Sequence, residues 1–168
     1  MMKVSVKIIH FEVMTSTKSS NSLLLTILQS TSVDSIGFQS VWLIARVLAG
    51  LLMIHNGLDK LADVQGFADN VVIFIGLPYP VFFTYCAAYI EIVAAVLLSI
   101  GLLTRLSALS LFLTMLVAIY FHLKGDGLQI APLETASLYA SFYLLFLLNG
   151  AGIFSLDALL AKWFISKD

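Results

Sequence analysis

Four long apolar segments, separated by short polar and turn-forming stretches, dominate the chain. They cover residues 41–58, 81–103, 106–123 and 136–154. Each is close to the ~20 residues that an α-helix needs to cross about 30 Å of hydrocarbon, and lipid offers no partners for the backbone groups of an open strand. The pattern therefore predicts an all-α integral membrane protein, a bundle of four transmembrane helices within residues 40–160.

Glycine and proline residues between the apolar segments predict where the helices turn. Residues 76–80 contain one glycine and two prolines, and residues 125–127 contain two glycines. Pro132 suits the first turn of the fourth helix, where its missing N–H costs no hydrogen bond. Only a few residues around Gly101 separate the second and third segments, so we expect these two helices to form an antiparallel hairpin.

The two ends of the chain differ from the apolar part. Residues 1–39 are rich in serine and threonine, and their short apolar run at 23–28 does not match a secretory signal. We expect them to form a polar cytoplasmic tail, with Met14 as an alternative start. Residues 161–168 are expected to form a short cytoplasmic C-terminus.

Lysine and arginine residues indicate the orientation of the helices, because cytoplasmic loops are enriched in them. One side of the predicted bundle carries only Lys60 and Lys124. The other side carries Lys3, Lys7, Lys18, Arg105, Lys162 and Lys167. We therefore expect a multi-pass protein of the cell (inner) membrane with both termini in the cytoplasm.

Composition excludes several classes of protein. Hydrophobic residues make up 60% of the chain and charged residues 11%, against about 25% charged residues in soluble domains. The net charge of -1 gives no basic field for nucleic acid. Cys86 is the single cysteine, so an internal disulfide or CxxC pair is impossible, although a mixed disulfide with a partner is not. Nucleotide-binding, serine-hydrolase and metalloprotease motifs are absent from the sequence.

Two charged residues lie inside the apolar segments, Arg46 in the first and Glu91 near the middle of the second. Charges at this depth face the bundle interior and pair with one another or with backbone carbonyls. Arg46 shares a helix face with Gly50, Met53 and Gly57, while Glu91 shares one with several alanines, and small residues let helices approach closely. We predict that Arg46 and Glu91 form a buried pair or share a polar network. Such a network would either fix the helix register or let Glu91 carry protons.

A second polar cluster is predicted at the other end of the helices. His55 and Asp59 share a face of the first helix, and His122 ends the third helix within about 5 Å of the same depth, beside Tyr120. These four residues are candidates for a small-ligand site, with quinone the favoured ligand. Two histidines on different helices also suit haem, the less favoured cofactor. The alternative is a pair of interfacial histidines in ordinary hydrogen bonds, and no metal site is expected.

A set of short motifs resembles the DoxX family of small bacterial membrane proteins. In order they are Arg46, Ala49-Gly50, residues 55–61, Gly76-Leu77-Pro78, Glu91, residues 101–105, His122, Glu134 and residues 150–157. The resemblance covers about residues 42–159. Singly these motifs are weak, but their order on four helices is fairly specific. Family members often carry proline and arginine around the final glycines, where this chain has Ala151 and Ile153.

The resemblance implies a four-helix membrane fold and a link to redox biology, but no agreed catalytic residues. The family takes its name from a subunit of a thiosulfate:quinone oxidoreductase, and relatives are tied to oxidative-stress and quinone- or thiol-related responses. The first expected function is therefore a membrane subunit or anchor of an oxidoreductase system, with a soluble or membrane redox partner protein. A non-enzymatic assembly or cargo factor and a small-solute or proton pathway are the alternatives. Small-residue helix faces would also suit a homodimer in the lipid bilayer.

Overall fold

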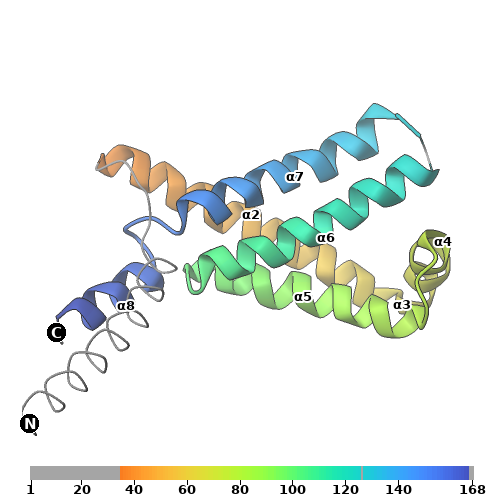
Figure 1. Cartoon of the computed structure of the whole chain (residues 1–168), viewed down its shortest axis with the longest axis horizontal. Coiled ribbons are helices and arrows are strands. Elements are labelled where there is room, and N and C mark those ends of the chain that lie inside the picture. Colours follow the sequence, from red (N-terminus) through yellow and green to blue (C-terminus); the bar gives the residue numbers. More distant parts are fainter. Residues whose placement is uncertain (1–34, 126, 167–168) are drawn as a thin grey trace, which may run out of the picture.

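The structure is a computed structural model of the chain, and it describes residues 35–125 and 127–166. Its long helices are α2 (Ile36–Ala62), α5 (Pro80–Ile100), α6 (Thr104–Gly125) and α7 (Ile130–Asn149). Three short elements connect α2 to α5: α3 (Val64–Phe67), the π-helix η1 (Ala68–Val72) and α4 (Ile73–Ile75). The last helix is α8 (Leu156–Ile165). Figure 1 shows the long helices side by side, with α8 near one end of the bundle and α3 and α4 at the other.

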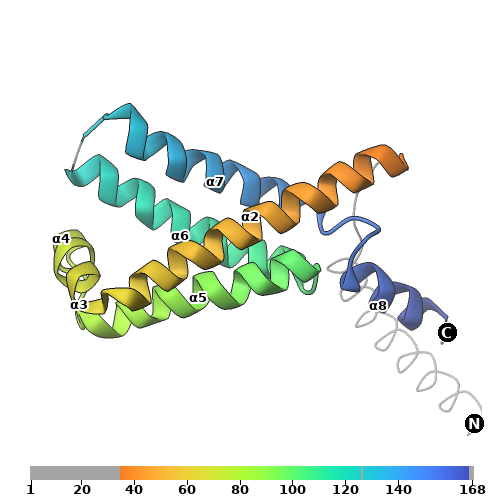
Figure 2. The ribbon, with the colours of Figure 1, turned by 180° about the vertical axis from the view of Figure 1, so that it is seen from behind.

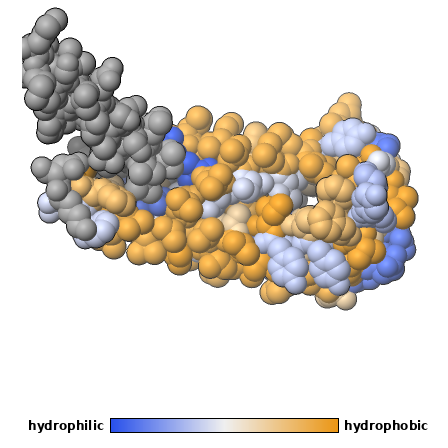
Figure 3. All heavy atoms as spheres, turned by 60° about the horizontal axis from the view of Figure 1, so that its bottom comes forward, coloured by the Kyte–Doolittle hydropathy of each residue, from blue (hydrophilic) through white to orange (hydrophobic). Residues whose placement is uncertain are grey.

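Three helices, α2, α5 and α6, are long and apolar enough to cross a membrane. Large apolar side chains cover their outward faces, such as Leu51, Val93 and Leu113. Figure 3 shows this apolar surface along much of the visible side of the bundle. An apolar surface of this extent suits lipid rather than water. The prediction of an all-α bundle of apolar helices is confirmed, while a fourth transmembrane helix stays a prediction.

The fourth apolar segment does not form one helix over 136–154, as its pattern predicts. Instead, α7 ends at Asn149 because the chain turns at Gly150, whose φ is +79°. A second glycine, Gly152 at φ +85°, turns the chain again before α8 begins at Leu156. Glycine adopts positive φ without steric cost, and apolar periodicity alone does not register such a break.

Both predicted terminal stretches include helix. Residues 1–34 of the predicted 1–39 tail lie outside the described residues, but residues 36–39 already belong to α2. Likewise, α8 continues into the predicted 161–168 stretch as far as Ile165. The helical start at Ile36 has a structural reason, because Gln39 is buried and bonds the loop that follows α7.

The long helices pack as two pairs. α2 packs mainly along α5, and α6 packs mainly along α7, while α5 and α6 join the pairs. A tight turn connects α5 to α6, with Gly101 at φ +71° and Leu103 at φ +48°, which confirms the predicted hairpin. Figures 1 and 2 both show the pairs close together near α8 and farther apart towards α4. We call these the α8 end and the cap end, and we call residues 64–75 the cap.

Close contact between α2 and α5 depends on two glycines of α2. A Cβ added to Gly50 would lie 2.7 Å from the carbonyl oxygen of Ala95. One added to Gly57 would lie 3.0 Å from the carbonyl oxygen of Ala88. Because these positions face backbone, which moves less readily than a side chain, the helix spacing requires glycine. The expectation that the faces of Arg46 and Glu91 point into the bundle agrees with the burial of both side chains.

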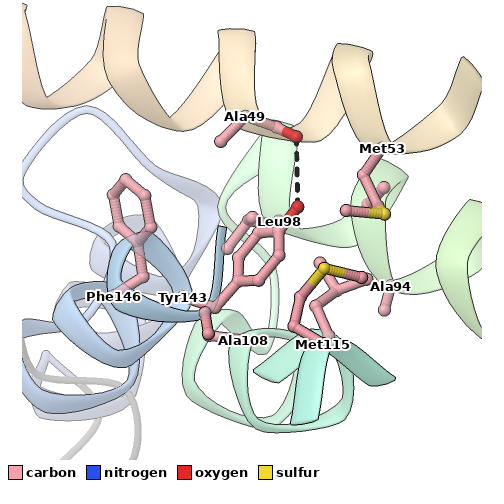
Figure 4. Packing of buried hydrophobic residues seen from close by; sticks show 11 residues of the cluster. Ala49, Met53, Ala94, Leu98, Ala108, Met115, Tyr143 and Phe146 are labelled. Carbon is pink, nitrogen blue, oxygen red and sulfur yellow. Dashed lines mark hydrogen bonds between the residues drawn. The ribbon is translucent and has the colours of Figure 1, made fainter. Parts of the chain in front are cut away.

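An apolar core fills the middle of the bundle. Its side chains come from all four long helices and include Met53, Leu98, Leu111 and Tyr143, each fully buried. Figure 4 shows the Tyr143 hydroxyl pointing towards α2, where it donates a hydrogen bond of 3.4 Å to the carbonyl oxygen of Ala49. This layer separates the polar groups near the cap end from those at the α8 end.

Candidate functional site

A buried ion pair between α2 and α5 is the main candidate site. The ammonium of Lys60 lies 2.7 Å from Oε2 of Glu91. The Glu91 side chain is 1% exposed and that of Lys60 is 16% exposed. Ionisable residues at this depth of an apolar bundle are functional candidates because their burial is costly.

The helix geometry explains why this lysine reaches the carboxylate. A Cβ on Gly57 would lie 3.3 Å from Cβ of Glu91, so the two residues are at the same level. Lys60 is one turn nearer the cap, and helical side chains point back towards the helix N-terminus. Accordingly, its ammonium also donates to the carbonyl oxygen of Asn56 at 3.3 Å.

The cap covers the ion pair on its outer side. The Phe67 ring lies 5.1 Å from the Lys60 ammonium, a cation–π distance. From there the cap continues through η1, which packs against α5. At its far end, Lys124 of α6 donates a 2.7 Å hydrogen bond to the carbonyl oxygen of Phe74 and lies 5.2 Å from the Phe74 ring. The cap therefore bridges the two helix pairs.

The predicted pairing of Arg46 with Glu91 is wrong. Both side chains are buried, as expected, but Arg46 donates to the carbonyl oxygens of Ala151 and Phe154. Because Glu91 pairs with Lys60, which is 14 residues beyond Arg46 on α2, the two charges are separated by about 20 Å along the helix. Lys60 follows the apolar pattern that ends at residue 58, yet it lies within α2.

Arg46 instead belongs to a polar cluster at the α8 end. Its guanidinium holds the loop between α7 and α8 by two carbonyl oxygens. Trp42 donates to the carbonyl oxygen of Gly150 at 3.1 Å, and Gln39 accepts from the backbone N–H of Ile153 at 3.0 Å. These bonds satisfy backbone carbonyl and N–H groups of the loop, so the cluster has a clear structural role.

Asp157 joins this cluster to the turn between α5 and α6. Its carboxylate accepts from the backbone N–H groups of Leu103 and Thr104, at 2.7 and 2.9 Å. A carboxylate at a helix N-terminus stabilises the helix by pairing its unbonded N–H groups. Gly101 is needed nearby, because an added Cβ would lie 2.8 Å from the Arg46 guanidinium. The sequence motif at residues 150–157 therefore connects the loop between α7 and α8 to α2 and to the turn between α5 and α6 by hydrogen bonds.

The predicted cluster of His55, Asp59, Tyr120 and His122 does not form a metal site in the described part of the chain. His55 and Asp59 pair with each other at 3.4 Å, with side chains 76% and 63% exposed. Tyr120 is exposed and lies 6.0 Å from the Lys124 ammonium. His122 contacts the ring of Phe121. A role for these residues in binding quinone stays a prediction.

Sequence reasoning missed Lys60, Gln39, Trp42 and Asp157 as partners of buried groups. For Lys60, a signal was present. It lies 14 residues after Arg46, which at 100° per residue places it within 40° of the Arg46 face. Gln39 had no comparable signal, because its partner is a backbone group in a loop 114 residues away.

Three helices that are long and apolar enough to cross a membrane indicate an integral membrane protein, and comparison with known proteins agrees. A model of the DoxX family matches residues 41–123. A Bacillus subtilis protein named "Putative oxidoreductase CatD" is 30% identical over 126 residues, which cover 74% of this chain and 90% of that protein. The Escherichia coli "Inner membrane protein YphA" is 31% identical over 123 residues, covering 68% of this chain and 86% of that protein.

A shorter match joins the chain to an uncharacterized protein of Haemophilus influenzae, 41% identical over 76 residues, or 42% of this chain and 57% of that protein. No solved structure matches the chain. The family model and the long matches show that the chain belongs to the DoxX family.

Proposed function

We propose that this protein is a membrane subunit or anchor of an oxidoreductase system in the inner membrane, with quinone as its small-molecule partner. The observation that carries the proposal is the Lys60–Glu91 ion pair, a buried polar site between two apolar helices. The name of the Bacillus subtilis relative supports the redox assignment, and that of the Escherichia coli relative supports the membrane.

A supporting role fits the chain better than autonomous catalysis. The sequence has a single cysteine and no cofactor motif, so electrons would have to come from a partner. That cysteine, Cys86, is partly buried on α5. The bundle would then supply a binding site within the bilayer, while the partner, soluble or membrane-bound, supplies the redox group.

The arrangement in the membrane follows from the same proposal. α7 has 20 residues, enough for about 30 Å, and it packs along α6, so it serves as the fourth transmembrane helix. The α8 end, with Arg105 and Lys162, faces the cytoplasm, and so do both termini. The cap and the Lys60–Glu91 pair then face the outer side.

A continuous proton or solute pathway has less support. Met53, Leu98, Leu111 and Tyr143 are fully buried between the ion pair and the Arg46 cluster. Among these residues the Tyr143 hydroxyl alone is polar, and it bonds to the carbonyl oxygen of Ala49, so the layer offers little support for a chain of hydrogen bonds across the bundle. The Lys60–Glu91 pair is therefore a site reached from one side.

Purification of the tagged protein in mild detergent tests this function. We expect quinone in the lipid extract and a known oxidoreductase among the co-purifying proteins, both enriched over a tagged membrane protein of another family. Recovery of neither would contradict the proposal. A stable partner without redox groups, and no quinone, would favour the assembly or cargo factor instead.

A further inference from the structure

The Lys60–Glu91 pair has unused hydrogen-bonding capacity. An ammonium has three N–H donors, and that of Lys60 uses two, on Asn56 and on Oε2 of Glu91. Among the described residues, the printed hydrogen bond of the Glu91 carboxylate is the one from Lys60 to Oε2, and this side chain is 1% exposed. A carboxylate accepts several hydrogen bonds, so the pair has a spare acceptor beside a spare N–H donor and is suited to a ligand that bonds to both groups.

The chemistry of the site limits the ligand. A hydroxyl group both donates and accepts, so a single hydroxyl would donate to Oε1 of Glu91 and accept from Nζ of Lys60. The Phe67 ring beside the ammonium offers an aromatic surface, on which a flat ring packs well. Because the outward faces of α2 and α5 carry apolar side chains such as Leu52 and Ile90, a lipid-soluble molecule is favoured over an ion.

We propose that Lys60 and Glu91 bind the hydroxyl of a lipid-soluble aromatic alcohol, the chemical class to which quinols belong. This deepens the proposed function, and rests on it for the identity of the natural ligand. The reduced form of a quinone carries hydroxyl donors and the oxidised form carries carbonyl acceptors alone. The carboxylate therefore selects the reduced form.

The cap acts as the lid of this site. Glu91 is 1% exposed and Lys60 16% exposed, and the cap packs against α2 and α5 beside them, so we place the ligand's entry beneath the cap. The cap is held by Phe67 over Lys60 on one side and by Lys124 on Phe74 on the other. Lys124 does not contact the ion pair in the described contacts, so it controls access without forming part of the binding site.

Binding of a matched pair of probes to the full chain in lipid nanodiscs tests the selectivity. Under anaerobic conditions, we expect decylubiquinol to bind at least about tenfold more tightly than decylubiquinone, since a hydrogen bond to a charged group contributes about 1.5–3 kcal/mol. In the double variant Lys60→Met/Glu91→Leu, the ratio of the two Kd values should fall to about one. Lys162→Met, the same lysine substitution on α8, should keep the wild-type ratio.

A ratio near one for the wild type, or an unchanged ratio in a folded double variant, would overturn the proposal. Its failure is distinct from that of the proposed function. Co-purification of quinone and an oxidoreductase with a wild type that binds both probes equally would refute only the selective site. If the protein binds the two probes selectively but co-purifies with neither quinone nor an oxidoreductase, only the proposed function would be refuted.

Stopped-flow binding of decylubiquinol tests the lid. Lys124→Met removes the hydrogen bond and cation–π contact that hold the cap. The association and dissociation rates should both rise, by about fivefold for each ~1 kcal/mol by which the free energy of cap closure is reduced. The Kd should change less than either rate. Unchanged rates would show that the cap does not control entry.

Discussion

The ammonium of Lys60 lies 2.7 Å from the carboxylate of Glu91 across the contact between α2 and α5, and Glu91 is 1% exposed. Removing one partner leaves the other charge unpaired in an apolar bundle. We predict that Lys60→Met and Glu91→Leu each lower the free energy of unfolding by about 3–5 kcal/mol, and that the double variant recovers most of this loss. Denaturant unfolding in mild detergent measures all three.

Additive losses in that double-mutant cycle would contradict the pairing. Because apolar residues of similar volume often replace a buried pair without loss, the double variant also serves as the folded reference for the binding experiments. Its elution as a single species in gel filtration is the control.

Replacing Gly50 by alanine should separate α2 from α5. The added Cβ would meet the carbonyl oxygen of Ala95 at 2.7 Å and also the hydroxyl of Ser99. Overpacking of this kind costs about 1–3 kcal/mol. The matched control is Gly37→Ala on the same helix, where the nearest atom is 3.8 Å away and the loss of glycine should stabilise the helix slightly. Equal Tm values for the two variants would contradict the close approach.

Arg46 should keep the loop between α7 and α8 closed. In a Cys86→Ser chain, Ala151→Cys places a thiol at a buried position, so a maleimide should react slowly. Adding Arg46→Lys removes the paired hydrogen bonds to the two loop carbonyl oxygens. We predict about tenfold faster labelling, since one hydrogen bond to a charged group contributes about 1.5–3 kcal/mol. Phe154→Cys, 44% exposed, should label rapidly with either residue at position 46.

Reporter fusions test the four-helix arrangement. Alkaline phosphatase, which folds outside the cytoplasm, should be active when fused after Gly127, between α6 and α7. It should be inactive when fused after Asp168, where green fluorescent protein should fluoresce instead. Phosphatase activity at both sites would show that α7 does not cross the membrane.

Local patterning of apolar and small residues made the helices predictable from the sequence. Apolar segments of membrane-spanning length gave α2, α5 and α6 to within a few residues at most ends, and Gly101 gave the hairpin turn. Small residues on the faces of Arg46 and Glu91 indicated that both faces point into the bundle. These properties depend on local composition and helix periodicity, which a sequence displays directly.

Partners of the buried charges were less predictable. The apolar pattern of the first segment ends at residue 58 and places Lys60 outside the helix, although α2 continues to Ala62. The length of a lysine side chain then decides the pairing, since it reaches back along the helix towards Glu91. Likewise, Gly150 and Gly152 adopt positive φ angles that end α7 within an apolar segment, and amino-acid composition does not reveal backbone angles.

The redox state of the quinone pool tests the central claim most directly. Membranes are extracted after an oxidant challenge from native cells, from a deletion strain and from strains complemented with the wild type or with Lys60→Met/Glu91→Leu. The account predicts that deletion shifts the quinol-to-quinone ratio, that the wild-type protein restores it and that the double variant does not. A ratio unaffected by deletion, or restored equally by both proteins, would contradict it.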